Sequence, residues 1–191
     1  MASAIFITHP DVAIDPNIPV PDWRLNPVGI ARMRAMLAQP WVGGITHVAC
    51  SLERKACDGA GILAAHLGIQ PQHHAGLGEN DRPATGYLPK PAFEALADAF
   101  FANPDHSMQG WERAVDAQAR IVGAVRAVLA TAPAGDVAVI SHGGVGALLL
   151  CHLRHAPISR AADQPPGNGG YFLRFDRLTW RLHADWTLID P

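Results

Sequence analysis

Hydrophobic and polar positions alternate along the chain in blocks that predict strands followed by helices. A short apolar run at residues 4–7 is stopped by Thr8-His9-Pro10 and predicts a buried first strand. Residues 44–49 and 136–140 have the same character and predict two more strands. Apolar residues at helical spacing predict helices at residues 26–39, 54–67, 92–102, 111–130 and 145–153.

The order of these blocks predicts the fold class. Strands alternating with helices favour an α/β fold, here a three-layer α/β/α sandwich with a mainly parallel sheet and helices on both faces. Residues 171–175 and 179–182 predict a C-terminal hairpin around Asp176-Arg177. We expect residues 1–191 to form one domain, with a loop and helical insertion at about 70–110 that covers the site.

Composition excludes several functional classes. The net charge of −2 provides no general field for nucleic acid or anionic lipid, so an anion site would have to be local. The three cysteines (Cys50, Cys57 and Cys151) are an odd number without a Cys-x-x-Cys pair, which argues against a disulfide framework and a structural zinc site. The N-terminal residues lack the features of a signal peptide, so we expect none, and no apolar run reaches membrane-spanning length. The expectation is therefore a soluble cytoplasmic protein.

Three polar residues follow predicted strands. His9 follows the first strand, Arg54 lies just after the second, and His142 follows the strand at 136–140. Ligands of parallel α/β sheets collect at the carboxyl ends of the strands. Each residue alone is more often a packed or solvated side chain, but two imidazoles and a guanidinium at one edge suit a tetrahedral dianion. Gly143 and Gly144 would let the backbone and the next helix N-terminus approach that anion.

Five short motifs in order resemble those of the histidine phosphatase (phosphoglycerate-mutase-like) superfamily. Thr8-His9-Pro10 looks like its Arg-His-Gly signature, and the segment from Asp22 to Gly29 resembles its Pro-Leu-Thr/Ser-x-x-Gly helix start. Leu52-Glu53-Arg54-Lys55-Ala56 is similar to its Leu-x-Arg-Ala segment, Leu77-Gly78-Glu79 to its acid loop, and Ser141-His142-Gly143-Gly144 to its second histidine motif.

The resemblance implies a mechanism without a metal or cofactor. His9 would attack phosphorus and form a phosphohistidine that water then hydrolyses. Arg54 and His142 would bind the non-bridging oxygens, while Glu79 would protonate the leaving oxygen and then take a proton from water. The adjacent His73 and His74 point to opposite faces of an extended segment, and no carboxylate or cysteine stands at ligand spacing, so no metal site is predicted there.

Thr8 is the clear departure from the family pattern, which has an arginine at this position. Its neutral hydroxyl would replace charge-assisted hydrogen bonds worth about 1.5–3 kcal/mol each. Arg82 is the first candidate to fill the place of the missing arginine, and Arg24 is the second. Without such a replacement, the chain would be a phosphate-binding or regulatory domain with weakened catalysis.

The leading hypothesis is a phosphatase that acts on a small phosphate monoester. Its partner would be that substrate or phosphate, and a homodimer is compatible with the sequence. A mutase is less favoured because the loop from His73 to Lys90 carries few cations for a second phosphate. The substrate pocket is predicted around residues 76–91, with Tyr87 and Leu88 as apolar walls.

Overall fold

The computed structural model describes residues 2–190. Its strands are β1 (Ser3–Thr8), β2 (Ile45–Cys50), β3 (Gln72–His73), β4 (Asp136–Ser141), β5 (Tyr171–Asp176) and β6 (Leu182–Leu188). Its α-helices are α1 (Pro27–Met36), α2 (Arg54–Leu67), α3 (Lys90–Ala102), α4 (Ala114–Thr131) and α5 (Gly143–Leu153).

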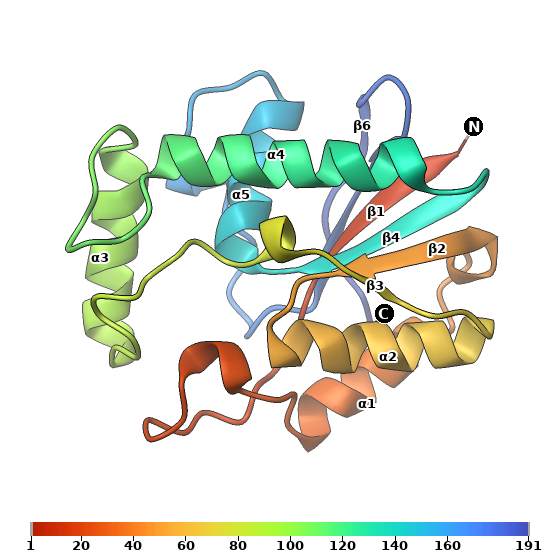
Figure 1. Cartoon of the computed structure of the whole chain (residues 1–191), viewed down its shortest axis with the longest axis horizontal. Coiled ribbons are helices and arrows are strands. Elements are labelled where there is room, and N and C mark those ends of the chain that lie inside the picture. Colours follow the sequence, from red (N-terminus) through yellow and green to blue (C-terminus); the bar gives the residue numbers. More distant parts are fainter. Residues whose placement is uncertain (1, 191) are drawn as a thin grey trace.

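The strands form one mixed sheet in the order β3-β2-β4-β1-β5-β6. The first four are mutually parallel, whereas β5 and β6 are antiparallel additions at one edge. Figure 1 shows α4 on one side of the sheet and α1 and α2 on the other, with α3 standing apart beyond one end of the strands. The α/β prediction, with its mainly parallel sheet and C-terminal hairpin, is confirmed.

The central strands are buried on both faces, which explains their nearly continuous apolar sequences. Every residue of β1 is buried, and alternate side chains enter different cores. Phe6 packs with α4 and α5, whereas Ile5 and Ile7 pack with α1 and α2. The sheet therefore holds its strand ends rigidly, because both faces are covered by helices.

Two helix boundaries differ from the sequence expectation by three residues, and the others differ by two or fewer. Helix α1 ends at Met36 instead of residue 39, and its last residues continue as a turn in which the Leu37 amide bonds to the Arg34 carbonyl. Pro40 disfavours a helix immediately before it. Helix α4 begins at Ala114 instead of residue 111, because the backbone of Arg113 is extended (ψ 145°) and the Glu112 amide donates its hydrogen bond to the Asp81 carbonyl instead. Trp111 nevertheless belongs to the core, with only 2% of its surface exposed.

Two strand boundaries also differ. The predicted insertion at about 70–110 contains the short strand β3, which pairs with the end of β2. Strand β6 occupies residues 182–188 instead of 179–182 because the hairpin turn is wider than expected. Asp176 holds that turn by accepting hydrogen bonds from the amides of Leu178 and Thr179. Among residues 2–190, no helix has the length and apolar character needed to span a membrane.

Candidate active site

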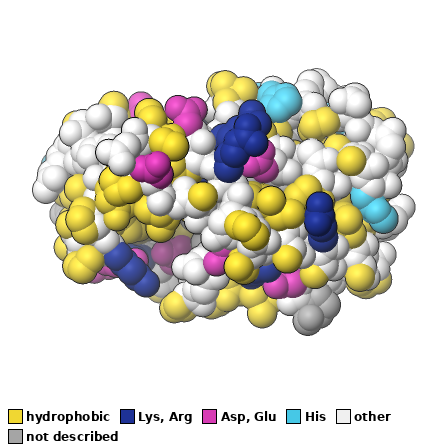
Figure 2. Space-filling model, turned by 90° about the horizontal axis from the view of Figure 1, so that it is seen from below, with side chains coloured by type: hydrophobic (Ala, Val, Ile, Leu, Met, Phe, Trp, Pro, Cys, Tyr) yellow, Lys and Arg dark blue, Asp and Glu magenta, His cyan; other side chains and the backbone are white. Residues whose placement is uncertain are grey.

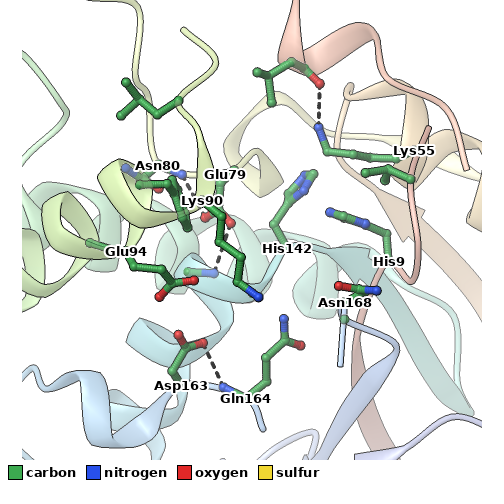
Figure 3. Close-up of a pocket in the computed structure, with 18 of the residues that line it drawn as sticks. His9, Lys55, Glu79, Asn80, Lys90, Glu94, His142, Asp163, Gln164 and Asn168 are labelled. Atoms are coloured by element: carbon green, nitrogen blue, oxygen red, sulfur yellow. Dashed lines mark hydrogen bonds between the residues drawn. The ribbon is translucent and has the colours of Figure 1, made fainter. Parts of the chain in front are cut away.

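The carboxyl ends of β1, β2 and β4 bring His9, Ser51 and His142 to one edge of the sheet. A cavity of about 740 Å³ opens at this edge. Its polar lining includes His9, Lys55, Glu79, His142, Gln164 and Asn168. Figure 3 shows the rings of His9 and His142 next to each other, with Lys55 on one side and Gln164 and Asn168 on the other.

His9 is held as a neutral imidazole with one free nitrogen. Its Nδ1 lies 3.0 Å from the carbonyl oxygen of Pro10, so Nδ1 carries the proton and donates it there. Burial, followed by the charges of His142 and Lys55, lowers the pKa of His9 from 6.5 to about 3. The lone pair of Nε2 is therefore available at neutral pH.

Gly169 packs directly against the backbone of His9. Its φ is +78°, and a Cβ at this position would stand 2.2 Å from the His9 carbonyl oxygen. A residue with a side chain would thus displace the loop or His9. The neighbouring Asn168 donates a hydrogen bond to Asp11, which ties the same loop to the chain just after His9.

His142 is fully buried beside His9, with the two ring centroids 5.2 Å apart in an edge-to-face arrangement. Its Nε2 lies 2.8 Å from Ser51 Oγ and 3.2 Å from Glu53 Oε1. Both groups contact the same ring nitrogen, so these residues are not a Ser-His-carboxylate triad. Among the described residues, Nδ1 of His142 has no hydrogen-bond partner. Burial lowers the pKa of His142, against the opposing charges of Glu53 and Glu79.

Lys55 and Glu53 form an ion pair at the start of α2. Lys55 is 4% exposed, and its Nζ donates to Glu53 Oε2 at 2.5 Å and to the Val20 carbonyl at 2.9 Å. Burial would raise the pKa of Glu53, but His142 and Lys55 lower it to about 2. Glu53 is therefore a carboxylate that links the lysine to the buried histidine.

The structure does not bring Arg54 to the cavity, and Lys55 occupies the expected place of that cation. The Arg54 side chain is half exposed and pairs with Asp58 on the outside of α2. The reason is helical phase, because neighbouring residues differ by about 100° around the axis. The buried face of α2 runs through Lys55, Gly59 and Leu63 at intervals of about one turn, a helical spacing that distinguishes Lys55 from Arg54 but that the motif match did not use.

Glu79 occupies the N-terminus of α5. Its carboxylate accepts hydrogen bonds from the amides of Gly144 at 3.0 Å and Val145 at 2.9 Å. A Cβ at Gly144 would lie 2.8 Å from Glu79 Oε1, so the glycine allows this approach. The expectation that these amides would face a bound anion is corrected, because the protein's own carboxylate takes them.

The charge state of Glu79 follows from its surroundings. Burial raises the pKa of its carboxyl, but the net shift is downward because of His142, Arg82 and a hydrogen bond from the Asn80 amide. Arg82 lines the same cavity, with its guanidinium 5.1 Å from the Phe93 ring centre and 5.2 Å from that of Trp111. Glu79 is thus ionised at neutral pH.

The hydroxyl of Thr8 is used within the protein. It accepts a hydrogen bond from the Tyr171 amide at 3.0 Å and donates to Gln164 Oε1 at 2.7 Å. The Gln164 amide nitrogen remains available beside Gly143, where a Cβ would lie only 2.5 Å from it. Thr8 thus orients a second donor that sequence reasoning missed, since residue 164 stands in a loop without a recognisable pattern.

The two arginines considered as replacements behave differently. Arg82 reaches the cavity wall, where its guanidinium lies over the rings of Phe93 and Trp111. Arg24 is exposed and lies outside the cavity lining. The structure therefore brings His9, Glu79, Arg82, His142 and Gly143 together at the cavity, with Thr8 just behind it, and leaves Arg24 and Arg54 outside.

Arg120 of α4 fixes the backbone that carries Glu79. Its guanidinium donates to the carbonyl oxygens of Gly76 and Gly78 at 2.9 Å and of Glu79 at 3.0 Å. Glu112 in turn binds the same guanidinium. The position of the Glu79 carboxylate is thus set by a helix more than thirty residues further along the chain.

Potential metal ligands lie elsewhere. Across residues 2–190, the one group of three such side chains is Cys50, Cys57 and His73. None of them lines the cavity around His9. The structure brings two cysteines to His73 that sequence spacing did not indicate.

The fold and site define an α/β protein with paired histidines at the carboxyl edge of a mainly parallel sheet. The family model of the histidine phosphatase superfamily (branch 1) matches residues 18–184, and the chain belongs to that superfamily. The match begins after His9, so the assignment of this histidine rests on its geometry and on the motif resemblance. No protein of curated function matches the chain by sequence.

Several solved structures share the fold along nearly the whole chain. A mycobacterial glucosyl-3-phosphoglycerate phosphatase solved with inorganic phosphate has a TM-score of 0.81 and 19% identity, with 100% of both chains covered. YhfR of Bacillus stearothermophilus has a TM-score of 0.78 and 17% identity, with 96% of this chain and 95% of that chain covered. TTHB049 of Thermus thermophilus has a TM-score of 0.66 and 21% identity over 97% and 99%. Family membership supports a function of the phosphatase type, and the solved structures show the shared fold.

Proposed function

We propose that the chain hydrolyses a small phosphate monoester through a phosphohistidine on His9. The observation that carries the proposal is the neutral imidazole of His9, whose Nδ1 is held by Pro10 while Nε2 is free beside buried His142. A deprotonated imidazole nitrogen is an effective nucleophile toward phosphorus. Membership in the histidine phosphatase superfamily supports the same chemistry.

In the first step, Nε2 of His9 forms a bond to phosphorus and the bond from phosphorus to the ester oxygen breaks. The alcohol oxygen leaves with the electron pair and then takes a proton. Lys55 Nζ, His142 and the amide nitrogen of Gln164 line the place where the non-bridging oxygens would sit. Donors that are already fixed stabilise the charge that develops on these oxygens.

In the second step, the oxygen of water forms a bond to phosphorus and the bond from phosphorus to Nε2 of His9 breaks. Glu79 takes the proton of the water and then releases it to solvent. The lowered pKa keeps Glu79 ionised, so the carboxylate can accept this proton but holds none to give to the leaving oxygen. Esters whose alcohols leave without a proton, such as phenols, should therefore react faster than esters of ordinary alcohols. Phosphate and free His9 are the products of the cycle.

The cavity suits an ester with a compact organic group. Its volume of about 740 Å³ exceeds the space that a phosphate needs, and Tyr87 and Leu88 stand in its wall, together with Phe93. Figure 2 shows a hollow with hydrophobic side chains around it and acidic side chains inside. We propose that the partner of the chain is a small phosphorylated molecule, and that the chain binds neither nucleic acid nor a membrane. We further propose that the reaction uses no metal or other cofactor and takes place in the cytoplasm.

The test is to trap the intermediate. The chain is mixed with 4-nitrophenyl phosphate in the presence of a chelator, quenched in base, and digested for mass spectrometry. We expect phosphate on His9, inhibition of turnover by vanadate, and loss of both phosphorylation and turnover in His9→Ala. Turnover that persists in His9→Ala would refute the proposal, as would phosphorylation of another residue.

A second candidate function is phosphate binding with little turnover. The observation in favour of this alternative is that the positive groups of the site are already compensated by carboxylates. Lys55 is paired with Glu53, and the first amides of α5 bind Glu79. This alternative predicts that inorganic phosphate binds to the wild-type chain but not to Lys55→Met. It also predicts that no aryl phosphate is hydrolysed and that His9 is never phosphorylated.

A further inference from the structure

Two thiols and an imidazole lie together behind the end of β2, away from the cavity that holds His9. They belong to Cys50, the last residue of β2, Cys57 in the first turns of α2, and His73 in β3. One ligand atom from each lies within 4.8 Å of the other two. Cys50 is buried, Cys57 is half-buried and His73 is exposed, so the group reaches from the core to the solvent.

The fold itself brings the three side chains together. Cys50 and His73 are direct partners in the parallel pairing of β2 with β3, so their side chains point to the same face of the sheet. Cys50 packs in the core that α2 covers, and Cys57 packs against the same core. Cys57 Sγ also bonds to the Ser51 carbonyl at 3.3 Å, which directs the thiol toward the end of β2.

The chemistry of this group suits a soft or borderline metal ion. Thiolate sulfur and imidazole nitrogen are the preferred ligands of Zn²⁺, with bonds of about 2.3 Å and 2.0–2.1 Å. Ligand atoms of a tetrahedral site are then roughly 3.5 Å apart, so the three atoms need only a small approach. His73 is exposed and can make most of that movement by rotating its side chain.

We propose that Cys50, Cys57 and His73 form a binding site for a zinc-type divalent metal ion. Binding forms two metal–sulfur bonds and one metal–nitrogen bond, and the two thiol protons pass to solvent. The fourth position is left to water on the exposed side of His73. The site joins the end of β2 to the start of α2, on either side of the segment that holds Ser51, Glu53 and Lys55.

Cobalt is the probe for this site, because Co²⁺ replaces Zn²⁺ and reports thiolate ligands by absorption. The full chain is reduced, treated with a chelator, dialysed and titrated with Co²⁺. We expect one ion per chain, a charge-transfer band from sulfur to cobalt, and d–d bands typical of tetrahedral coordination. Added Zn²⁺ should displace the cobalt and remove these bands.

Variants assign the ligands. Cys57→Ser and His73→Ala change half-buried and exposed side chains, so the fold should persist, and each should weaken Co²⁺ binding at least about tenfold. Cys151→Ser and His74→Ala are the matched controls and should bind as the wild type does. Circular dichroism confirms that each variant is folded.

Two results would overturn the proposal. One is a reduced wild-type chain that takes up neither Co²⁺ nor Zn²⁺. The other is a sulfur-to-cobalt band that keeps its full intensity and affinity in Cys57→Ser or disappears in Cys151→Ser. The readout is spectroscopic and does not depend on phosphatase activity, so the metal-site proposal can fail or succeed independently of the role of His9.

Discussion

Replacing Thr8 by valine removes one hydroxyl while keeping the shape of the side chain. In the wild type, that hydroxyl satisfies the buried Tyr171 amide and holds Gln164 Oε1. Valine leaves the Tyr171 N–H buried without a partner, which costs about 1–3 kcal/mol. For a chain of this size, a loss of about 2 kcal/mol lowers Tm by roughly 4–8 °C.

The same substitution should also affect turnover through Gln164. Released from Thr8, the Gln164 amide no longer points a fixed donor into the cavity. A neutral hydrogen bond is worth about 1 kcal/mol, so we expect kcat/KM for an aryl phosphate to fall roughly fivefold. Thr8→Ser keeps the hydroxyl and is the matched control, with near wild-type kinetics.

Calorimetry and steady-state kinetics on four proteins decide the matter: wild type, Thr8→Val, Gln164→Ala and the double variant. If Thr8 acts on turnover by holding Gln164, the double variant is no slower than Gln164→Ala. Kinetic losses that simply multiply would refute this coupling. A Thr8→Val protein with unchanged Tm would refute the account of the Tyr171 amide.

Three further predictions concern charges at the site. Lys55→Met should raise KM for an aryl phosphate about tenfold or more, because it removes a charge-assisted donor. Arg54→Ala, on the outer side of α2, should change KM less than about twofold. Equal effects of the two variants would contradict the assignment of Lys55 as the phosphate-binding cation. Glu79→Gln should slow the water step more than the first step, so quenched-flow samples should contain more phosphohistidine than wild type, and less would exclude Glu79 as the base. Burial lowers the pKa of His9 from 6.5 to about 3, so protons bind preferentially to the unfolded chain below pH 6.5. His9 alone should therefore reduce the unfolding free energy by up to about 1.4 kcal/mol between pH 7.5 and 5.5. Denaturant titrations of His9→Gln should show a smaller decrease of the unfolding free energy over this pH range, and a decrease equal to that of the wild type would contradict the pKa shift.

The strand ends were predictable from the sequence because they depend on local patterns. Apolar runs that stop at a histidine place His9 and His142 at the carboxyl edge of the sheet, and the rules of parallel sheets then bring them together. The helix at 54–67 was also predictable to its exact ends, because Gly68 closes it with a left-handed conformation.

Other parts of the site depend on long-range packing. Whether Arg54 or Lys55 reaches the cavity depends on which face of α2 packs against the sheet. The motif match did not distinguish these faces, although the helical spacing of Lys55, Gly59 and Leu63 does. Gln164 reaches the cavity only because β5 pairs with β1 and sets the Tyr171 amide against Thr8. A contact across more than 150 residues leaves no periodic trace in a single sequence.

The anchoring of Glu79 by Arg120 divides the cavity into a fixed and an adjustable wall. Three backbone carbonyls on one guanidinium keep residues 76–79 in place, whether or not the cavity is filled. The opposite wall at residues 12–23 has internal contacts, such as the hydrogen bonds from the Trp23 indole to the Asp15 and Ile18 carbonyls, and is tied to α2 by the hydrogen bond from Lys55 to the Val20 carbonyl. Exchange of ester and product should proceed along that second wall. Changes in substrate range are therefore expected to arise from residues 12–23, while the reacting end stays constant.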